Sequence, residues 1–179
     1  VRFSGVEERP RIASGGPYIV AATPGVFEAL DLRIVEGRGF LPGEDETTAP
    51  VAVVDETMAS LIWPGESAIG KCLLIGDAEQ PPCNEVVGVV ENSRRQELIE
   101  GEQMQYFVPL GQGVLVVPST FFVRADPEAF GALIPAIRNE LHAMSPAIRF
   151  VTVRPYRDYI DPQARSWSLG ATMFTAFGA

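Results

Sequence analysis

The chain has 179 residues, 46% of them hydrophobic and 21% charged, a globular composition that excludes a disordered or fibrous chain. This length suits one medium domain or two small ones that share a core. The formal net charge is −9, with 14 basic residues against 23 acidic ones, which argues against nucleic acid as a partner because phosphate binding needs clustered lysine and arginine.

The N-terminal part of the sequence predicts a lead-in followed by a strand, a helix and a second strand. Residues 1–16 carry several glycines and a proline, and we expect them to form a flexible lead-in. Residues 18–22 are predicted to form a strand. Thr23 then serves as an N-cap and Pro24 as the first residue of a short helix. A further strand is expected over 32–35.

A buried strand and a capped helix are predicted next. Residues 51–54 are a short, continuously apolar run, which favours a strand with both faces buried. Asp55 is expected to cap a helix that carries Met58, Leu61 and Ile62. Residues 63–65, Trp-Pro-Gly, end that helix.

Further strands are expected in the second half of the chain. Residues 71–75 and 85–90 resemble an antiparallel pair with a long connection, and 105–110 form a short extended segment. Residues 114–117 and 120–124 are β-rich, with Pro-Ser between them.

The C-terminal part predicts one long amphipathic helix. Residues 126–128, Asp-Pro-Glu, are a helix start, and Pro135 is expected to bend the helix locally. A last strand is predicted over 148–153, and a short helix or turn over 156–160. The apolar face of the long helix comprises Phe130, Leu133, Ile134, Ile137 and Leu141.

Taken together, the predicted strands and helices are mixed without strict alternation. This favours an α+β fold with mixed sheets over a doubly wound one. Residues 166–179 carry no charged side chain. They are read either as the start of a truncated transmembrane helix or as a C-terminal helix packed on the domain.

The segment 65–72 resembles a nucleotide-binding loop, because it reads Gly-x-x-x-x-Gly-Lys-Cys. Such a loop needs Ser or Thr at its last position as a Mg²⁺ ligand, and Cys72 is a poor substitute. It must also follow a strand and open a helix. Here a helix is predicted before it and a strand after it, so the segment is interpreted as a turn that enters a strand.

Cys72 and Cys83 flank the loop between two predicted strands. A cysteine pair that closes a loop suits an oxidising compartment, and a structural disulfide is favoured over two free thiols. Two thiolates without further Cys or His ligands nearby do not complete a metal site.

The sequence offers little support for catalysis. His142, the only histidine, lies near the end of the long helix, where it interacts favourably with the helix dipole. The acidic residues 44–46 lack the spacing of a calcium loop and are interpreted as a solvated loop. We therefore predict no catalytic residues, no metal and no cofactor.

Several segments, taken in order and with their spacing, follow the pattern of a known family. They are 23–30, 32–40, 50–56, 61–66 with 69–71, 86–90, 107–110 and 122–124. These segments resemble those of MacB-like periplasmic core domains of ABC transporter permeases. Two residues depart from the family pattern, since Asp31 stands where Gly is common and Asp55 where Asn is common. The cysteine pair resembles a subgroup of orphan permeases that lack a fused ATPase.

The resemblance implies a non-enzymatic module on the extracytoplasmic (periplasmic) side of the bacterial inner membrane. Residues 17–165 would form the core domain, with a smaller inserted subdomain over about 50–100 in a porter-like subdomain. Residues 166–179 would begin a transmembrane helix. The implied partners are the permease's own transmembrane helices and a periplasmic protein or cargo.

Two other functions remain open at this stage. One is an extracytoplasmic ligand- or partner-binding domain of a membrane sensor, which would have similar flanking helices. The other is a secreted enzyme, which would need a concave site with convergent polar groups. The sequence does not identify the cargo, the direction of transport or the oligomeric state.

Overall fold

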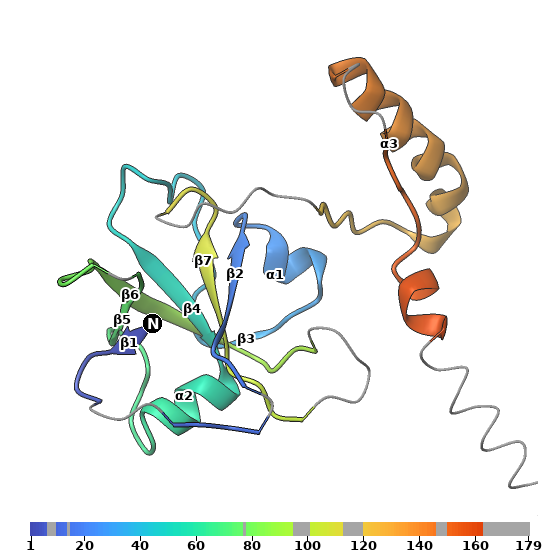
Figure 1. Cartoon of the computed structure of the whole chain (residues 1–179). Coiled ribbons are helices and arrows are strands. Elements are labelled where there is room, and N and C mark those ends of the chain that lie inside the picture. The colour runs from blue at the N-terminus through green and yellow to red at the C-terminus, as the bar shows by residue number, and fades with distance from the viewer. Residues whose placement is uncertain are drawn as a thin grey trace, which may run out of the picture. The chain divides into compact units, whose positions relative to one another are not determined.

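The fold is α+β with one mixed sheet, as the sequence predicted (Figure 1). Contacts divide the chain into two compact units, 1–95 with 99–123, and 96–98 with 124–179. We call these the sheet unit and the helical unit. The computed structural model describes residues 1–6, 10–13, 15–76, 78–94, 101–112, 120–145 and 150–162.

The sheet unit holds every strand of the described residues. The strand order is β1-β5-β6-β4-β7-β2, and β3 pairs with β6 beside this path. The pairs β2–β7 and β4–β6 are parallel and the others are antiparallel. The elements are β1 (Arg2–Phe3), β2 (Tyr18–Ala22), α1 (Val26–Ala29), β3 (Ile34–Gly37), β4 (Val51–Asp55), α2 (Glu56–Ile62), β5 (Cys72–Leu74), β6 (Cys83–Val90) and β7 (Gln105–Pro109).

Strand β4 is buried on both faces, which explains its continuous apolar sequence. Successive side chains of a strand point to opposite faces, so β4 contributes to two hydrophobic clusters. Ala52 and Val54 pack in the cluster that includes Met58 of α2. Val51 and Val53 pack in the cluster that includes Phe27 of α1. The two helices therefore cover opposite faces of the sheet.

Several predicted elements are confirmed with small shifts. The buried strand, the helix capped by Asp55 and the antiparallel β5–β6 pair all form. The strand expected over 32–35 instead spans Ile34–Gly37. The helix after Pro24 forms, but its N-cap is Gly25 and no side chain caps it, so the prediction for Thr23 was wrong.

Other expectations fail or lie outside the described residues. Arg2–Phe3, within the expected lead-in, form a strand that pairs with β5. Residues 120–124 are in neither helix nor strand, and neither are 150–153, so strands were wrongly predicted there. Residues 114–117 and 148–149 lie outside the described residues. The boundary of the inserted subdomain stays a prediction, and β4 and β6 of that segment share the sheet with β2 and β7.

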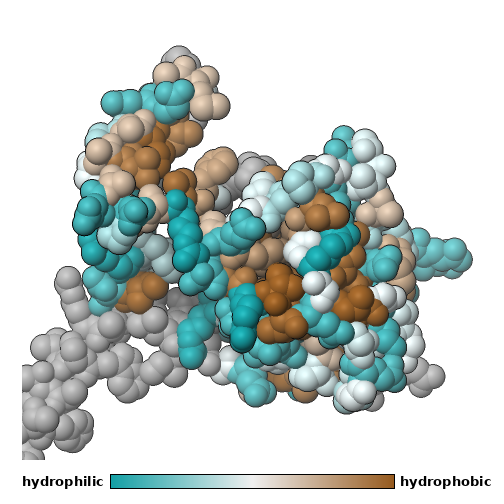
Figure 2. All heavy atoms as spheres, turned by 180° about the vertical axis from the view of Figure 1, so that it is seen from behind, coloured by the Kyte–Doolittle hydropathy of each residue, from teal (hydrophilic) through white to brown (hydrophobic). Residues whose placement is uncertain are grey.

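The helical unit contains one long amphipathic helix, as predicted. A 3₁₀ turn, η1 (Pro127–Ala129), leads into α3 (Phe130–Met144), which continues through Pro135. The five apolar residues predicted for one face are half-buried, and most other α3 residues are exposed. Figure 2 shows apolar side chains of this unit next to hydrophilic ones. Residues 157–162, close to the predicted 156–160, are helical.

Within the described ranges, no helix combines the length and the apolar composition that crossing a bilayer requires. The transmembrane start predicted at 166–179 lies outside the described residues.

Candidate functional site

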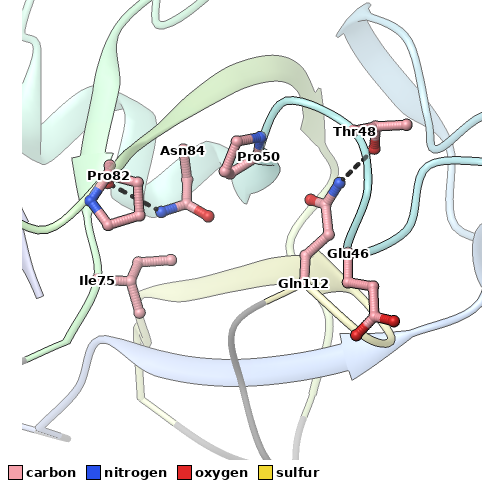
Figure 3. Close-up of a pocket in the computed structure, with 7 residues that line it drawn as sticks. All are labelled: Glu46, Thr48, Pro50, Ile75, Pro82, Asn84 and Gln112. Carbon is pink, nitrogen blue, oxygen red and sulfur yellow. Dashed lines mark hydrogen bonds between the residues drawn. The ribbon is translucent and has the colours of Figure 1, made fainter.

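A hollow of about 340 Å³ opens on the sheet unit (Figure 3). Its wall combines the loop that precedes β4, the loop that connects β5 with β6, and the turn that follows β7. Three of the lining side chains are apolar and four are polar, so the hollow could hold a ligand with both kinds of surface. The lining residues are Glu46, Thr48, Pro50, Ile75, Pro82, Asn84 and Gln112.

The Gln112 side chain connects two sides of the hollow through hydrogen bonds. Its side chain is 5% exposed, and its Oε1 accepts a hydrogen bond from the Val51 N–H at 3.0 Å. Its Nε2 donates to Thr48 Oγ1 at 2.9 Å and to the carbonyl oxygens of Asp45 and Ala49 at 3.0 and 3.3 Å. The loop before β4 is therefore held by the turn after β7.

Asn84 lines the hollow on the side away from Gln112 (Figure 3). It lies on β6, is 5% exposed, and donates through Nδ2 to the carbonyl oxygens of Leu73 and Pro82 at 3.2 and 3.4 Å. Two carbonyl acceptors on one end of the amide fix its orientation, because only the nitrogen can donate to them. The oxygen end is the one directed away from Pro82 in Figure 3.

A buried carboxylate lies elsewhere in the sheet unit. Asp55, 1% exposed, accepts hydrogen bonds from the Met58 N–H at 2.7 Å and the Gln105 N–H at 2.9 Å. It thereby caps α2 and joins the end of β4 to the start of β7. Burial raises the pKa of Asp55 to about 7, although the two N–H donors lower it in part.

The family model of the MacB-like periplasmic core domain matches residues 2–143 of the chain. The chain belongs to this family. The match spans the whole of β1 to β7 and nearly all of α3, so it includes most of the sheet unit and the helical unit up to residue 143.

Three solved structures are similar to this MacB-like domain. The periplasmic region of MacB from Actinobacillus actinomycetemcomitans is 14% identical (TM-score 0.48), with 70% of this chain and 56% of that one covered. The extracellular domain of the noncanonic ABC-type transporter YknZ from Gram-positive bacteria is 19% identical (TM-score 0.39; 51% and 42% covered). A domain of a permease protein from Porphyromonas gingivalis is 14% identical (TM-score 0.43; 76% and 67% covered).

The MacB-like chain thus spans 56% and 42% of the first two structures' own length. No curated protein sequence matches it significantly.

Cys72 and Cys83 of the MacB-like domain form a disulfide bond, as the sequence predicted. Their Cα atoms lie 5.2 Å apart, and the bridge closes a loop between residues 11 positions apart. In sequence, Cys83 lies between Pro82 and Asn84, which both line the hollow. We propose that this bridge stabilises the fold, and its reduction tests this role.

Reduction of this bridge is expected to lower the free energy of unfolding by about 3 kcal/mol, because the loop is no longer closed in the unfolded chain. The measurement is urea unfolding with and without dithiothreitol. A Cys72→Ser, Cys83→Ser double variant serves as the control and should show no response to dithiothreitol. Two titratable thiols in the unreduced, denatured protein would contradict the bridge.

The remaining residues weighed in the sequence do not come together in one site. Residues 65–71 lie between α2 and β5, and Cys72 is the first residue of β5, so the segment is a turn that enters a strand, as interpreted. Its amides are used internally, since the N–H of Gly70 donates to Val86 O and that of Lys71 to Ala68 O. His142 is exposed in the last turn of α3. Among the described residues, no group of three or more His, Cys, Asp or Glu could hold a metal ion.

The acidic loop 44–46 is partly structured by its own side chains. Glu44 is ion-paired with Arg38 at 2.7 Å and accepts a hydrogen bond from the Leu41 N–H at 2.8 Å. The adjacent Glu46 lines the hollow.

Sequence reasoning missed the hollow. Asn84 and Gln112 carry no motif, and only their positions beside strand ends and turn residues set them apart. The residues that meet at the hollow are separated by up to 66 positions in sequence, from Glu46 to Gln112. Local patterns could not bring them together.

Proposed function

We propose that this chain is the extracytoplasmic domain of an ABC-type transporter permease, and that it transmits conformational change and contacts cargo or a periplasmic partner. The observation that carries the proposal is the family match over residues 2–143. The ATPase of such a transporter works on the cytoplasmic side, so an outer domain contributes by movement and contact.

Two features of the chain support this role. The chain folds as two compact units, and separate units are the usual parts of a hinge or shear motion. Large apolar side chains are exposed in both units, with Phe121 of the sheet unit 78% exposed and Phe150 of the helical unit 92% exposed. Exposed apolar groups of this size are suited to contact with another protein surface.

Spin-label distances in the full-length permease, reconstituted with its ATPase, test the transmission of movement. One label replaces Glu85, exposed on β6, and the other replaces Asn139, exposed on α3. Both cysteines of this domain are in the disulfide, so they do not compete with the introduced cysteines for the label. We expect the distance distribution to differ between the nucleotide-free and the ATP-trapped state.

A label pair inside the sheet unit, at Ser60 on α2 and at Glu85, is the matched control and should keep one distribution in both states. Identical Glu85–Asn139 distributions in a permease that hydrolyses ATP would contradict the proposal. A change caused only by an added ligand, with no effect of nucleotide, would favour the sensor instead.

A further inference from the structure

The polar groups of the hollow on the sheet unit differ in what they leave available to a ligand. The Thr48 hydroxyl donates to Asp45 O at 2.9 Å and accepts from the Asp45 N–H and from Gln112 Nε2. The N–H groups of the Gln112 amide already donate hydrogen bonds to Asp45 O, Thr48 Oγ1 and Ala49 O. The hollow therefore offers a ligand no spare hydrogen-bond donor from either side chain.

Asn84 leaves an acceptor. Its Nδ2 is held by Leu73 O and Pro82 O, while its Oδ1 receives no hydrogen bond from the part of the chain that the structure describes. Figure 3 shows this oxygen directed toward the side of the hollow that Gln112 lines. Among the described residues, the buried side-chain polar atoms without a hydrogen-bond partner are Trp63 Nε1 and Gln103 Oε1, so Asn84 Oδ1 is open to solvent. A donor group of a ligand would replace water there.

Glu46 adds a charged acceptor at the rim. Its side chain is exposed, and no described residue donates a hydrogen bond to its carboxylate or pairs with it. The remaining wall is apolar, from Pro50, Ile75 and Pro82. The hollow thus combines one neutral acceptor, one anionic acceptor and an apolar surface.

We propose that this hollow binds a guanidinium or ammonium group carried on an aliphatic stem, either of a free metabolite or of an Arg or Lys side chain. Such a cation carries only donors, which match the free oxygens of Asn84 and Glu46. Its methylene groups contact the two prolines and Ile75. The net charge of −9 attracts cations toward the unit as a whole. This inference is independent of the transport role.

The test uses n-butylguanidinium as the probe and n-butylurea, its neutral analogue, as the comparison. Both are titrated into the ¹⁵N-labelled 179-residue chain, and amide chemical shifts are followed by NMR. We expect saturable shifts at Thr48, Asn84 and Gln112 with butylguanidinium, with a Kd on the order of 1–10 mM for a ligand of this size. Butylurea should leave these amides unchanged.

Two matched variants separate the site from general charge attraction. Glu46→Gln should weaken butylguanidinium binding by about fivefold, the size of one partly exposed charge pair. Glu85→Gln removes the same charge from the neighbour of Asn84 on β6, whose side chain points to the opposite face and is exposed. That variant should bind as the unchanged chain does.

The source of the cation is decided by comparing butylguanidinium with a capped Ala-Arg-Ala peptide at the same site. Tighter binding of the peptide assigns the hollow to a partner's side chain, and tighter binding of the small cation assigns it to a metabolite. Equal shifts with butylurea, or equal affinities of the Glu46→Gln and Glu85→Gln variants, would overturn the proposal. Failure here would leave the spin-label result unaffected, so the two proposals fail separately.

Discussion

Replacing Gly88 with alanine is expected to destabilise the sheet unit by about 3 kcal/mol or more. Gly88 lies in β6 opposite Gly37 of β3. A Cβ at this position would overlap the carbonyl oxygen of Arg38, which is backbone and cannot rotate away. Relief therefore requires β3 to shift from β6, which strains the strand pairing and the hydrogen bond from the Arg38 N–H to Val87 O.

Urea unfolding followed by circular dichroism measures this loss. Gly25→Ala is the matched control, because Gly25 has a negative φ of −79° and a Cβ there would meet nothing within 4 Å. This control should change the free energy of unfolding by no more than about 0.5 kcal/mol. A Gly88→Ala variant as stable as the Gly25→Ala variant would show that the Arg38 carbonyl oxygen does not lie so close to Gly88.

The free energy of unfolding is also expected to depend on pH through Asp55. Burial raises the pKa of Asp55 from 3.8 to about 7 in the folded chain. Between these two values the folded state binds more protons than the unfolded one, so the contribution of Asp55 to stability falls as pH rises. A shift of this size corresponds to a loss of up to about 4 kcal/mol between pH 4 and pH 8.

The Asp55→Asn variant isolates this contribution, because its side chain stays neutral. The N–H groups of Met58 and Gln105 donate to different oxygens of Asp55, and in asparagine an NH₂ group, which cannot accept, replaces one of these oxygens. The variant should therefore be less stable than the native chain at pH 4. The difference in free energy of unfolding between the native chain and the variant should disappear, or change sign, by pH 8. Unfolding in urea across this range, for both chains, is the measurement.

The Asp45→Asn variant is a control, because the pKa of Asp45 is shifted in the direction opposite to that of Asp55. Hydrogen bonds from Thr47 lower the pKa of this exposed carboxyl from 3.8, so its contribution to stability is lost only as pH falls below that value. The difference in stability between the native chain and this variant should therefore stay nearly constant from pH 4 to pH 8. A stability difference between native chain and Asp55→Asn variant that is constant from pH 4 to pH 8 would contradict the raised pKa of Asp55.

The local sequence was enough to predict the central elements of the sheet unit. The apolar run at 51–54 became the doubly buried β4, and Asp55 became the cap of α2. Both follow from short-range chemistry, since burial of four consecutive apolar residues and capping by the next side chain involve neighbours in sequence. The glycines at 37 and 88 were visible too, but their shared role was not, because it depends on the pairing of β3 with β6.

The β-rich segment 120–124 shows the limit of this reasoning. It has the aromatic and β-branched composition of a strand, yet it forms none in the described residues, and Phe121 is 78% exposed. Strand propensity describes how well a residue fits a pleated, half-buried surface. Without a neighbouring strand to pair with, composition alone does not produce one.

The sequence by itself determined the α+β class, the buried strand β4, the capped helix α2 and the cysteine pair, and its motifs agree with the family that the comparison established. Only the tertiary structure decided the strand order, the contact of Gly37 with Gly88, and the hollow with its free oxygens at Asn84 and Glu46. Hydrophobic periodicity and capping act between neighbours along the chain, whereas strand order and the lining of the hollow arise from residues that are distant in sequence and meet in the fold.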